Sequence, residues 1–237
     1  MLVRTWNLYH GRTYPPSRRL HLERMVRLVT ADAPDVVALQ EVPLWAVRRL
    51  ESWSGMASAW AMTMPAVLGP LARRATDLDP QRFRSSFTGQ ANALLVNPHF
   101  EARRHRRLVL NPGLSRGEWL LRGGQRRVCQ ALEVEARGER LVLANLHASN
   151  SPDRRLVDEE IERAVGFLAG AECCVLCGDF NVARHSVPAF TEPIDGIDQV
   201  LVRGATLERG PEPWPEERRR FDGLVLSDHA PVEAVVA

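Results

Sequence analysis

Two polar residues follow an apolar stretch in the segment VLCGDFNV. The apolar run that begins at Val175 shows no polar alternation, which predicts a strand buried on both faces, and it ends in Asp179 and Asn181. Side chains at positions i and i+2 of an extended chain point the same way. Asp179 and Asn181 would then face one common point. A simple turn is the alternative interpretation, because Asp and Asn favour turns.

The same pattern recurs along the chain, where polar residues lie at the boundaries of apolar segments. These residues are Asn7, Glu41, His147, Asp179, Asn181, Asp198, Asp228 and His229. Taken singly, Asn7 could cap a turn and His147 could be a core histidine. Glu41 is harder to explain in that way, because a carboxylate that ends a buried run needs a partner or a cation. Repetition over six segments favours one shared site over independent turns.

The residue types indicate which chemistry such a site would perform. Carboxylate and amide oxygens suit a hard cation such as Mg²⁺ or Mn²⁺. Two histidines beside them suit acid–base work or the stabilisation of an oxyanion. Together these groups predict metal-assisted attack of water on a phosphate ester.

Elements that would position these residues can be read from the hydrophobic pattern. Strands are predicted at residues 2–7, 35–40, 91–97, 173–178, 197–202 and 230–237, and a pair of strands within 126–147 joined at Arg137 and Gly138. Helices are predicted from Ser17 through Val29, over 43–53 and over 151–170, the last with Ser151 as its cap. Residues 54–90 and 209–220 are predicted to be irregular. Strand content exceeds helix content, so helices should cover a strand-rich core.

Composition limits the remaining possibilities. The chain has 237 residues, 45% hydrophobic and 25% charged, which suits one large domain or two small ones. It has no apolar run long enough to span a bilayer and no recognisable signal peptide, so we expect a cytoplasmic protein. Cys174 and Cys177 form a CxxC motif, but residues three apart in a strand face opposite sides, which favours buried core cysteines over a redox or zinc site.

All 31 basic residues are arginines, and they are unevenly distributed. Between Ala102 and Val128 the sequence has eight arginines and one acid, Glu118. This segment is either a solvated face or a track for a phosphate backbone, since the planar guanidinium binds phosphate with two hydrogen bonds.

The quoted segments also resemble a known family. TWNLYHG, DVVALQEV, NLHASN, VLCGDFNV, IDQVLV and LSDHAPV, in this order, resemble the endonuclease/exonuclease/phosphatase superfamily, and the resemblance covers residues 1–237 as a single domain. It implies an α/β (α+β) fold, a four-layer α/β/β/α sandwich of two packed mixed sheets flanked by helices. GDFN together with SDHAPV is the specific part of the match.

The resemblance implies a metal centre and its surroundings. Glu41 corresponds to the principal metal carboxylate, helped by Asn7 and Asp228, with Mg²⁺ or Mn²⁺ as cofactor. His147 corresponds to the second histidine of the deoxyribonuclease and sphingomyelinase branches. Arg127 resembles an arginine that contacts the substrate phosphate.

It also implies a catalytic pair. His229 corresponds to the catalytic histidine, polarised by Asp198, with Asp195 as a rival partner. Asp179 and Asn181 correspond to the pair that holds the attacking water or the phosphate oxygens. Whether His229 or Asp179 is the base stays open at this point.

Departures from the family patterns narrow the range of possible substrates. The Trp-Cys-Asp-Arg stretch of the inositol phosphatases has no counterpart at GIDQVLV, and the pattern of the repair nucleases is absent at NLHASN. We therefore expect a monomeric, deoxyribonuclease I-like phosphodiesterase. DNA is one candidate for its phosphoester substrate. The alternatives are hydrolysis of a small molecule or lipid headgroup, and a catalytically inactive binding scaffold.

Overall fold

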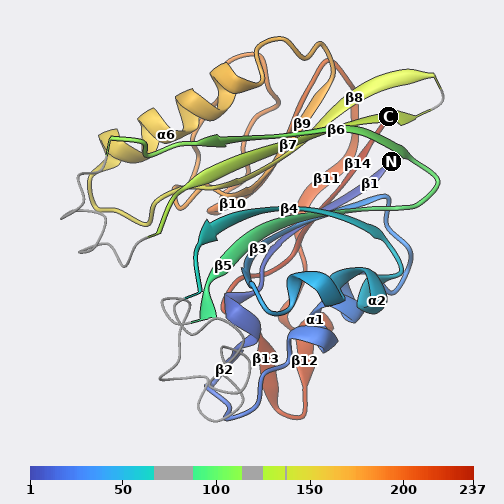
Figure 1. Ribbon diagram of the computed structural model, residues 1–237, viewed down its shortest axis with the longest axis vertical. Coiled ribbons are helices and arrows are strands. Elements are labelled where there is room, and N and C mark those ends of the chain that lie inside the picture. The colour runs from blue at the N-terminus through green and yellow to red at the C-terminus, as the bar shows by residue number, and fades with distance from the viewer. Residues whose placement is uncertain (67–87, 114–124, 137) are drawn as a thin grey trace.

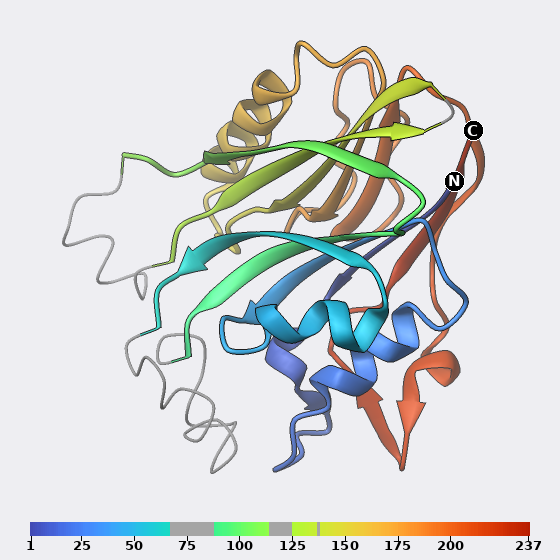
Figure 2. The ribbon, with the colours of Figure 1, turned by 45° about the vertical axis from the view of Figure 1, so that its right-hand side comes forward.

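Two β-sheets pack face to face, and helices cover both outer sides (Figure 1). The computed structural model describes residues 1–66, 88–113, 125–136 and 138–237. Figure 2 shows the same layers from a second direction, with α6 (Arg154–Phe167) on one outer side and α1 (Leu22–Val29) and α2 (Leu50–Ser54) on the other.

The first sheet has six strands in the order β11-β14-β1-β3-β5-β4. Their bounds are β1 (Leu2–Asn7), β3 (Val36–Pro43), β4 (Ala57–Met64), β5 (Gln90–Val96), β11 (Leu207–Pro213) and β14 (Val232–Val236). At its centre β1 pairs in parallel with β3 and antiparallel with β14. The first and last long strands of the chain are therefore neighbours.

The second sheet has five strands in the order β10-β9-β8-β7-β6. Their bounds are β6 (Glu101–Val109), β7 (Val128–Ala136), β8 (Glu139–His147), β9 (Cys174–Asp179) and β10 (Asp198–Arg203). Only β8 and β9 run parallel in this sheet, and α6 is the crossover between them. The parallel pair brings the carboxyl ends of two neighbouring strands to one edge.

Short elements complete the described chain. A three-stranded sheet contains β2 (Thr13–Tyr14), β12 (Arg220–Phe221) and β13 (Leu224–Leu226). Short 3₁₀ helices are η1 (Tyr9–Gly11), η2 (Val47–Arg49) and η4 (Glu216–Arg219).

Three hydrophobic clusters separate the four layers. Met25 of α1 packs with Leu39 of the six-stranded sheet in one outer cluster, and Ile161 of α6 belongs to the other. Val3 and Leu143 belong to the inner cluster, between the sheets. The predicted α/β/β/α sandwich is confirmed.

Buried amides join the two sheets inside this apolar layer. Gln40 Nε2 of β3 donates to Asn145 Oδ1 of β8 at 2.8 Å and to Thr5 Oγ1 at 3.0 Å. Asn145 Nδ2 in turn donates to the carbonyl oxygens of Leu39 and Ala93. These bonds are strong in the buried layer between the sheets, so they favour one alignment of the sheets.

Most predicted elements are present, and the differences have local causes. The structure confirms, within a few residues, the strands at 2–7, 35–40, 91–97, 173–178, 197–202 and 230–237, the strand pair within 126–147 and the helix over 151–170. The cap of that helix is Asp153 and not Ser151, because the Asp153 side chain accepts a hydrogen bond from the Arg155 N–H. Arg137, in the predicted turn, lies outside the described residues. The helix expected from Ser17 begins only at Leu22, and of the helix expected over 43–53 only η2 and α2 are helical.

Two segments were wrongly predicted. Residues 54–90, expected to be irregular, contain β4, and the part at 67–87 lies outside the described residues. Residues 209–220 contain most of β11, the helix η4 and the start of β12 rather than a loop. Charged and proline-rich edge strands such as β11 lack the alternation by which strands are recognised.

The cysteines pack as predicted. All four are free, and Cys174 and Cys177 lie in different hydrophobic clusters, on opposite faces of β9. Burial raises the pKa of Cys174 to about 12, which keeps the thiol protonated. Among the described residues, no helix is long and apolar enough to cross a membrane.

Gly178 sets the spacing between β9 and β8 just before Asp179. It has a φ of 137°, and a Cβ atom there would lie 1.9 Å from the carbonyl oxygen of Leu146. Only glycine fits so close to a neighbouring backbone.

We predict that Gly178→Ala lowers the free energy of unfolding by about 3 kcal/mol or more, because β8 and β9 must separate to admit the methyl group. Urea unfolding measures the change. Gly166→Ala in α6 is the matched control, since a Cβ atom at Gly166 would meet nothing within 4 Å, and it should be neutral or stabilising by about 0.5–1 kcal/mol. Equal stability of the two variants would contradict the prediction.

Candidate active site

Strand ends from both sheets meet at one edge of the sandwich. In the six-stranded sheet, β1 ends at Asn7, which is aligned with Gln40 of the parallel strand β3. In the five-stranded sheet, Asp179 is aligned with His147 on one side and with Asp198 on the other. The register places these three chemically active residues next to one another.

Glu41 reaches the site because β3 is irregular there. The β3–β5 register shifts between Leu39 and Val42, and Glu41 has a φ of 55°. A bulge bends the strand and redirects a side chain. The Glu41 carboxylate contacts His10 Nε2 at 2.9 Å and lies 4.0 Å from His147 Nε2. Burial opposes its charged form, but His10 and His147 hold the pKa of Glu41 well below its usual range.

Asp179 is the buried centre of the site, with 1% of its surface exposed. Its Oδ2 accepts a hydrogen bond from Asn7 Nδ2 at 2.9 Å, across the two sheets, and its Oδ1 accepts one from the backbone N–H of Asn181 at 2.9 Å. Burial and the nearby Asp198 carboxylate raise the pKa of Asp179 above its ordinary value.

His229 and Asp198 form a hydrogen-bonded pair. His229 Nδ1 lies 2.8 Å from Asp198 Oδ2, and His229 Nε2 lies 3.9 Å from Asp179 Oδ2. Burial lowers the pKa of His229, but the bond to Asp198 and the other carboxylates outweigh it and raise the pKa to about 9. Asp195, the rival partner, is exposed and pairs with Arg184 at 2.8 Å.

Backbone contacts hold the loop that carries His229. Trp6 Nε1 donates to the carbonyl oxygen of His229 at 2.9 Å, and the N–H of His229 donates to Ser227 Oγ at 3.1 Å. Ser227 Oγ also donates to the carbonyl oxygen of Asn7 at 2.7 Å. These bonds tie the entrance of β14 to the end of β1, so the imidazole is held in place from both strands.

His147 lies between a carboxylate and a guanidinium. Its Nε2 is 3.6 Å from Asp179 Oδ2 and 3.0 Å from Arg127 Nη1. Burial and the charge of Arg127 lower the pKa of His147 to about 3. His147 is therefore a neutral imidazole at physiological pH, whereas His229 is charged.

Asn181 and Asp228 lie at the border of the site. Asn181 has a φ of 52°, so the chain has left the extended conformation, and its Nδ2 donates to the carbonyl oxygen of Ala148 at 2.9 Å. Its backbone bond to Asp179 is the turn that the alternative interpretation predicted. Asp228 is exposed, with Oδ1 3.4 Å from Ser227 Oγ.

The donor atoms of Asp179, Asp198 and His229 lie within 4.8 Å of one another, close enough to hold a metal ion. Glu41 and Asp228 are not members of this cluster among the described residues. Among the described residues, the cluster at the His229–Asp198 pair is thus the place where the structure brings three possible metal ligands together.

His10 is the site residue that the sequence analysis missed. It follows Asn7 by three residues in TWNLYHG, and η1 turns it toward Glu41, with a φ of 56° at His10. The signal was its place inside a quoted motif, since a histidine in a tight turn beyond a strand end can reach the neighbouring strand end.

A polar cavity adjoins Arg127. Its volume is about 380 Å³, and it is lined by Asn111, Gln125, Arg127, Ser149, Asn150 and Ser151. Ser149 is fixed from α6, because Glu160 accepts hydrogen bonds from its N–H at 2.7 Å and from its hydroxyl at 2.8 Å. Among the described lining residues there is no aromatic side chain, which suits a polar group of a ligand.

Comparisons with known proteins agree with this architecture. Residues 5–229 match the family model described as Endonuclease/Exonuclease/phosphatase family. A search of curated proteins found no matching relative.

Solved structures share the fold over the whole chain. A functionally unknown conserved protein from Enterococcus faecalis V583 is similar with a TM-score of 0.71 and 17% identity, covering 100% of this chain and 99% of that chain. D. rerio TDP2 complexed with a single strand DNA product has a TM-score of 0.68 and 12% identity, covering 100% and 98%. A mannosyl-6-phosphatase from Bacteroides thetaiotaomicron VPI-5482 has a TM-score of 0.66 and 13% identity, covering 100% and 99%.

We predict that Asp198→Asn lowers the pKa of His229 in the metal-free protein from about 9 toward its usual value of about 6.5. A neutral amide cannot stabilise the imidazolium as a carboxylate does. Titration followed by NMR of ¹⁵N-labelled histidine measures the shift. Asp195→Asn is the matched control and should leave the titration unchanged.

The same pair makes stability depend on pH. Because the pKa of His229 in the folded protein lies above its unfolded value, the stabilisation is complete below about pH 6.5 and is lost as the pH rises through about 9. Asp198→Asn should remove this dependence between pH 6.5 and 9. Parallel unfolding curves of wild type and variant over that range would contradict the assignment.

Proposed function

Because the chain belongs to the endonuclease/exonuclease/phosphatase family, we propose that it is a metal-dependent phosphoesterase, a deoxyribonuclease I-like phosphodiesterase. The observation that carries the proposal is the hydrogen-bonded pair of His229 and Asp198 facing the buried carboxylate of Asp179. A scaffold without activity would have no need for three ionisable groups to be held together at such an energetic cost.

The residues present fit a hard divalent cation. Glu41, Asp179 and Asp198 bring three carboxylates to one edge, with Glu41 and Asp179 both beside His147. We place Mg²⁺ or Mn²⁺ at Glu41, with Asn7 and Asp228 as further ligands. The place inside the His229–Asp198 pair is less suitable, because His229 Nδ1 is already bonded to Asp198 and Mg²⁺ prefers oxygen ligands.

The protein groups then divide the work of hydrolysis. A bound cation would supply charge neutralisation at a phosphoryl oxygen. We assign Asp179 as the base that takes the proton of the attacking water, because its raised pKa brings it toward neutral pH. His229, kept charged by Asp198, would stabilise the negative charge of the pentavalent transition state. Asn181 fixes the orientation of Asp179 through its backbone N–H.

His147 and Arg127 would act on the substrate together. Their contact at 3.0 Å places a neutral imidazole and a guanidinium side by side, with the imidazole 3.6 Å from Asp179 Oδ2. Arg127 would bind a phosphate oxygen, since a guanidinium donates two parallel hydrogen bonds to such a group. His147 would support the transition state beside it.

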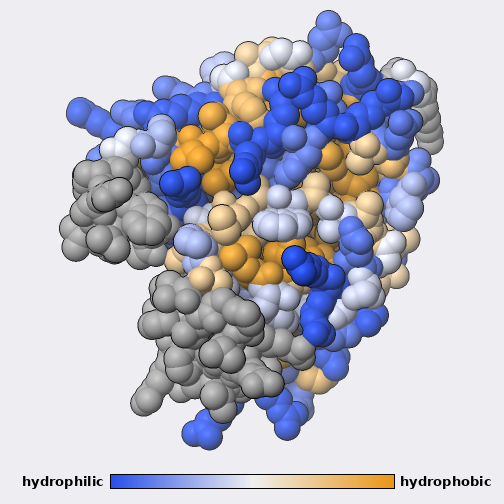
Figure 3. Space-filling view, viewed as in Figure 1, coloured by the Kyte–Doolittle hydropathy of each residue, from blue (hydrophilic) through white to orange (hydrophobic). Residues whose placement is uncertain are grey.

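The arginines of β6 support a nucleic-acid substrate only in part. Figure 3 shows hydrophilic side chains, with hydrophobic ones between them, over the five-stranded sheet at the top of the view, in which β6 is an edge strand. Arg103 pairs with Glu135 at 2.6 Å, and Arg106 lies 3.6 Å from Glu133. Arg104 and Arg107 are both exposed, and neither pairs with a carboxylate in the described part of the chain. Two of the four are thus available for a phosphate backbone.

Hydrolysis of a small phosphoester is the second candidate. The polar cavity beside Arg127 would accept a hydroxylated leaving group, and it has no described aromatic side chain on which a base could stack. The likeness to a mannosyl-6-phosphatase supports the same candidate at the level of the fold. We propose one domain over residues 1–237 that acts as a monomer, and a cytoplasmic location stays a prediction.

We predict that Glu41→Gln lowers metal-dependent hydrolysis of bis-p-nitrophenyl phosphate at least about 100-fold, because it removes the charge that binds the cation and keeps the shape. Excess chelator should abolish the activity of the wild type. Glu162→Gln, an exposed change on α6, is the control and should retain full activity. Undiminished turnover in chelator would reject metal dependence, and circular dichroism checks the fold of each variant.

A second prediction separates DNA from small substrates. If Arg104 and Arg107 contact phosphates, replacing both with Gln should flatten the log–log salt dependence of plasmid cleavage by about 1.8, at about 0.9 per phosphate. Hydrolysis of the small diester should stay unchanged. Replacing Arg103 and Arg106, which are engaged by carboxylates, is the matched control and should flatten the slope less. An unchanged slope in both double variants would favour the small-phosphoester candidate.

A further inference from the structure

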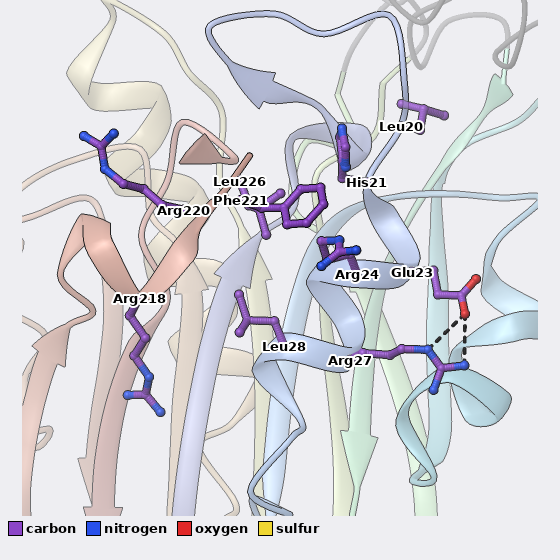
Figure 4. Close-up of a pocket in the computed structure, with 10 residues that line it drawn as sticks. All are labelled: Leu20, His21, Glu23, Arg24, Arg27, Leu28, Arg218, Arg220, Phe221 and Leu226. Carbon is purple, nitrogen blue, oxygen red and sulfur yellow. Dashed lines mark hydrogen bonds and ion pairs between the residues drawn. The ribbon is translucent and has the colours of Figure 1, made fainter. Parts of the chain in front are cut away.

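A second cavity lies between α1 and the β12–β13 hairpin, apart from the residues of the candidate active site. Its volume is about 590 Å³, within the range of about 300–1,000 Å³ for small-molecule sites. Figure 4 shows His21, Arg24 and Phe221 gathered at its centre, with Arg218 and Arg220 on the hairpin side. None of its lining residues has a part in the proposed hydrolysis.

Charge in this cavity is predominantly positive. Four arginines and one acid, Glu23, line it, and Glu23 is held by Arg27 at 2.9 Å. Arg220 pairs with Glu216, and Arg218 stacks on the Trp214 ring at 3.4 Å and lies 3.6 Å from Glu233. These contacts leave Arg24 as the lining arginine without a carboxylate partner among the described residues.

Arg24 is held in a way that keeps its donors available. Its guanidinium carbon lies 3.4 Å from the centre of the Phe221 ring. Stacking uses the flat face of a guanidinium, whereas its five N–H groups point outward in the plane. The Phe221 contact therefore restricts the side chain without consuming a hydrogen-bond donor.

His21 supplies a second polar atom at the same place. Its Nε2 is buried and has no hydrogen-bond partner, and its ring lies 5.8 Å from that of Phe221. Burial and the charge of Arg24 lower the pKa of His21. With its proton on Nε2, the ring can donate a hydrogen bond to an oxyanion. A bound oxyanion would give both groups the partner that they lack. Leu20 and Leu28, which also line the cavity, would strengthen that interaction by excluding water.

We propose that this cavity is a second anion site, which binds a phosphate group through Arg24 and His21. Two sources could present that group, a small phosphorylated compound or the backbone of a nucleic-acid strand. The site adjoins segments that carry active-site residues, because His21 N–H donates to the carbonyl oxygen of Gly11 and β13 leads directly into Ser227. An anion bound in this cavity would therefore stabilise the segments that position His10 and His229.

Isothermal titration calorimetry with inorganic pyrophosphate and with a short oligothymidylate tests the proposal on the full chain. Arg24→Gln should weaken binding at least 10-fold, and His21→Leu should weaken it as well. Hydrolysis of bis-p-nitrophenyl phosphate should be unchanged in Arg24→Gln, and circular dichroism shows whether the variant is folded. Arg155→Gln, an exposed arginine of α6, is the matched control and should bind as the wild type does.

The two ligands distinguish the sources. Binding of pyrophosphate that depends on Arg24 indicates a small phosphorylated ligand, and binding of the oligonucleotide alone indicates a strand. Binding that survives Arg24→Gln but is lost in Arg127→Gln would place the anion in the active site and overturn the proposal. Absence of binding by both ligands would overturn it too. Neither outcome depends on whether the protein hydrolyses phosphoesters.

Discussion

The burial of Asp179 between two sheets is the constraint on which the site depends. A carboxylate removed from water is unstable unless it is paired, hydrogen-bonded or neutralised. The groups that interact with the Asp179 carboxylate come from different parts of the chain. They are an amide from β1, a backbone N–H from the turn after β9, and an imidazolium from the loop before β14. Each of these groups is held in turn by a further bond, so the geometry around Asp179 reflects the packing of the whole sandwich.

The site is consequently a property of the interface between the sheets. The six-stranded sheet brings Asn7, Glu41 and His229, and the five-stranded sheet brings His147, Asp179 and Asp198. Gln40 and Asn145, one from each sheet, are hydrogen-bonded to each other and fix how the two sheets face each other. Family membership supports a phosphoester hydrolase, while the substrate depends on the groups that surround this centre.

Much of this arrangement was predictable from the sequence, because strand ends are visible as apolar runs that stop at polar residues. The runs that end at Asn7, His147 and Asp179 have the predicted boundaries, since buried strands without alternation leave a clear hydrophobic signal. The CxxC motif was predictable for the same reason: positions three apart in a strand face opposite sides.

Other features were not predictable, because they depend on tertiary contacts or on unusual backbone. The bulge that turns Glu41 into the site and the turn that brings His10 to it require positive φ angles at non-glycine residues, which residue type does not reveal. The strands β4, β6 and β11 were missed, and all three are sheet edges that expose several side chains, charged ones in β6 and β11. Edge strands are recognised by their partners more than by their own composition.

The pairing of β1 with β14 has a consequence for the order of folding. The two strands are separated by nearly the whole described chain. One side of β1 nevertheless gains its hydrogen-bonded neighbour only when β14 pairs with it. Contacts between such distant segments form slowly, because a long loop must close first. Asp228 and His229 immediately precede β14, so they are synthesised after β1, β3 and β9 and are fixed only when β14 pairs with β1. A nascent chain would already contain β1, β3 and β9 while lacking its imidazolium, and hydrolytic competence would therefore coincide with the final closure of the central sheet.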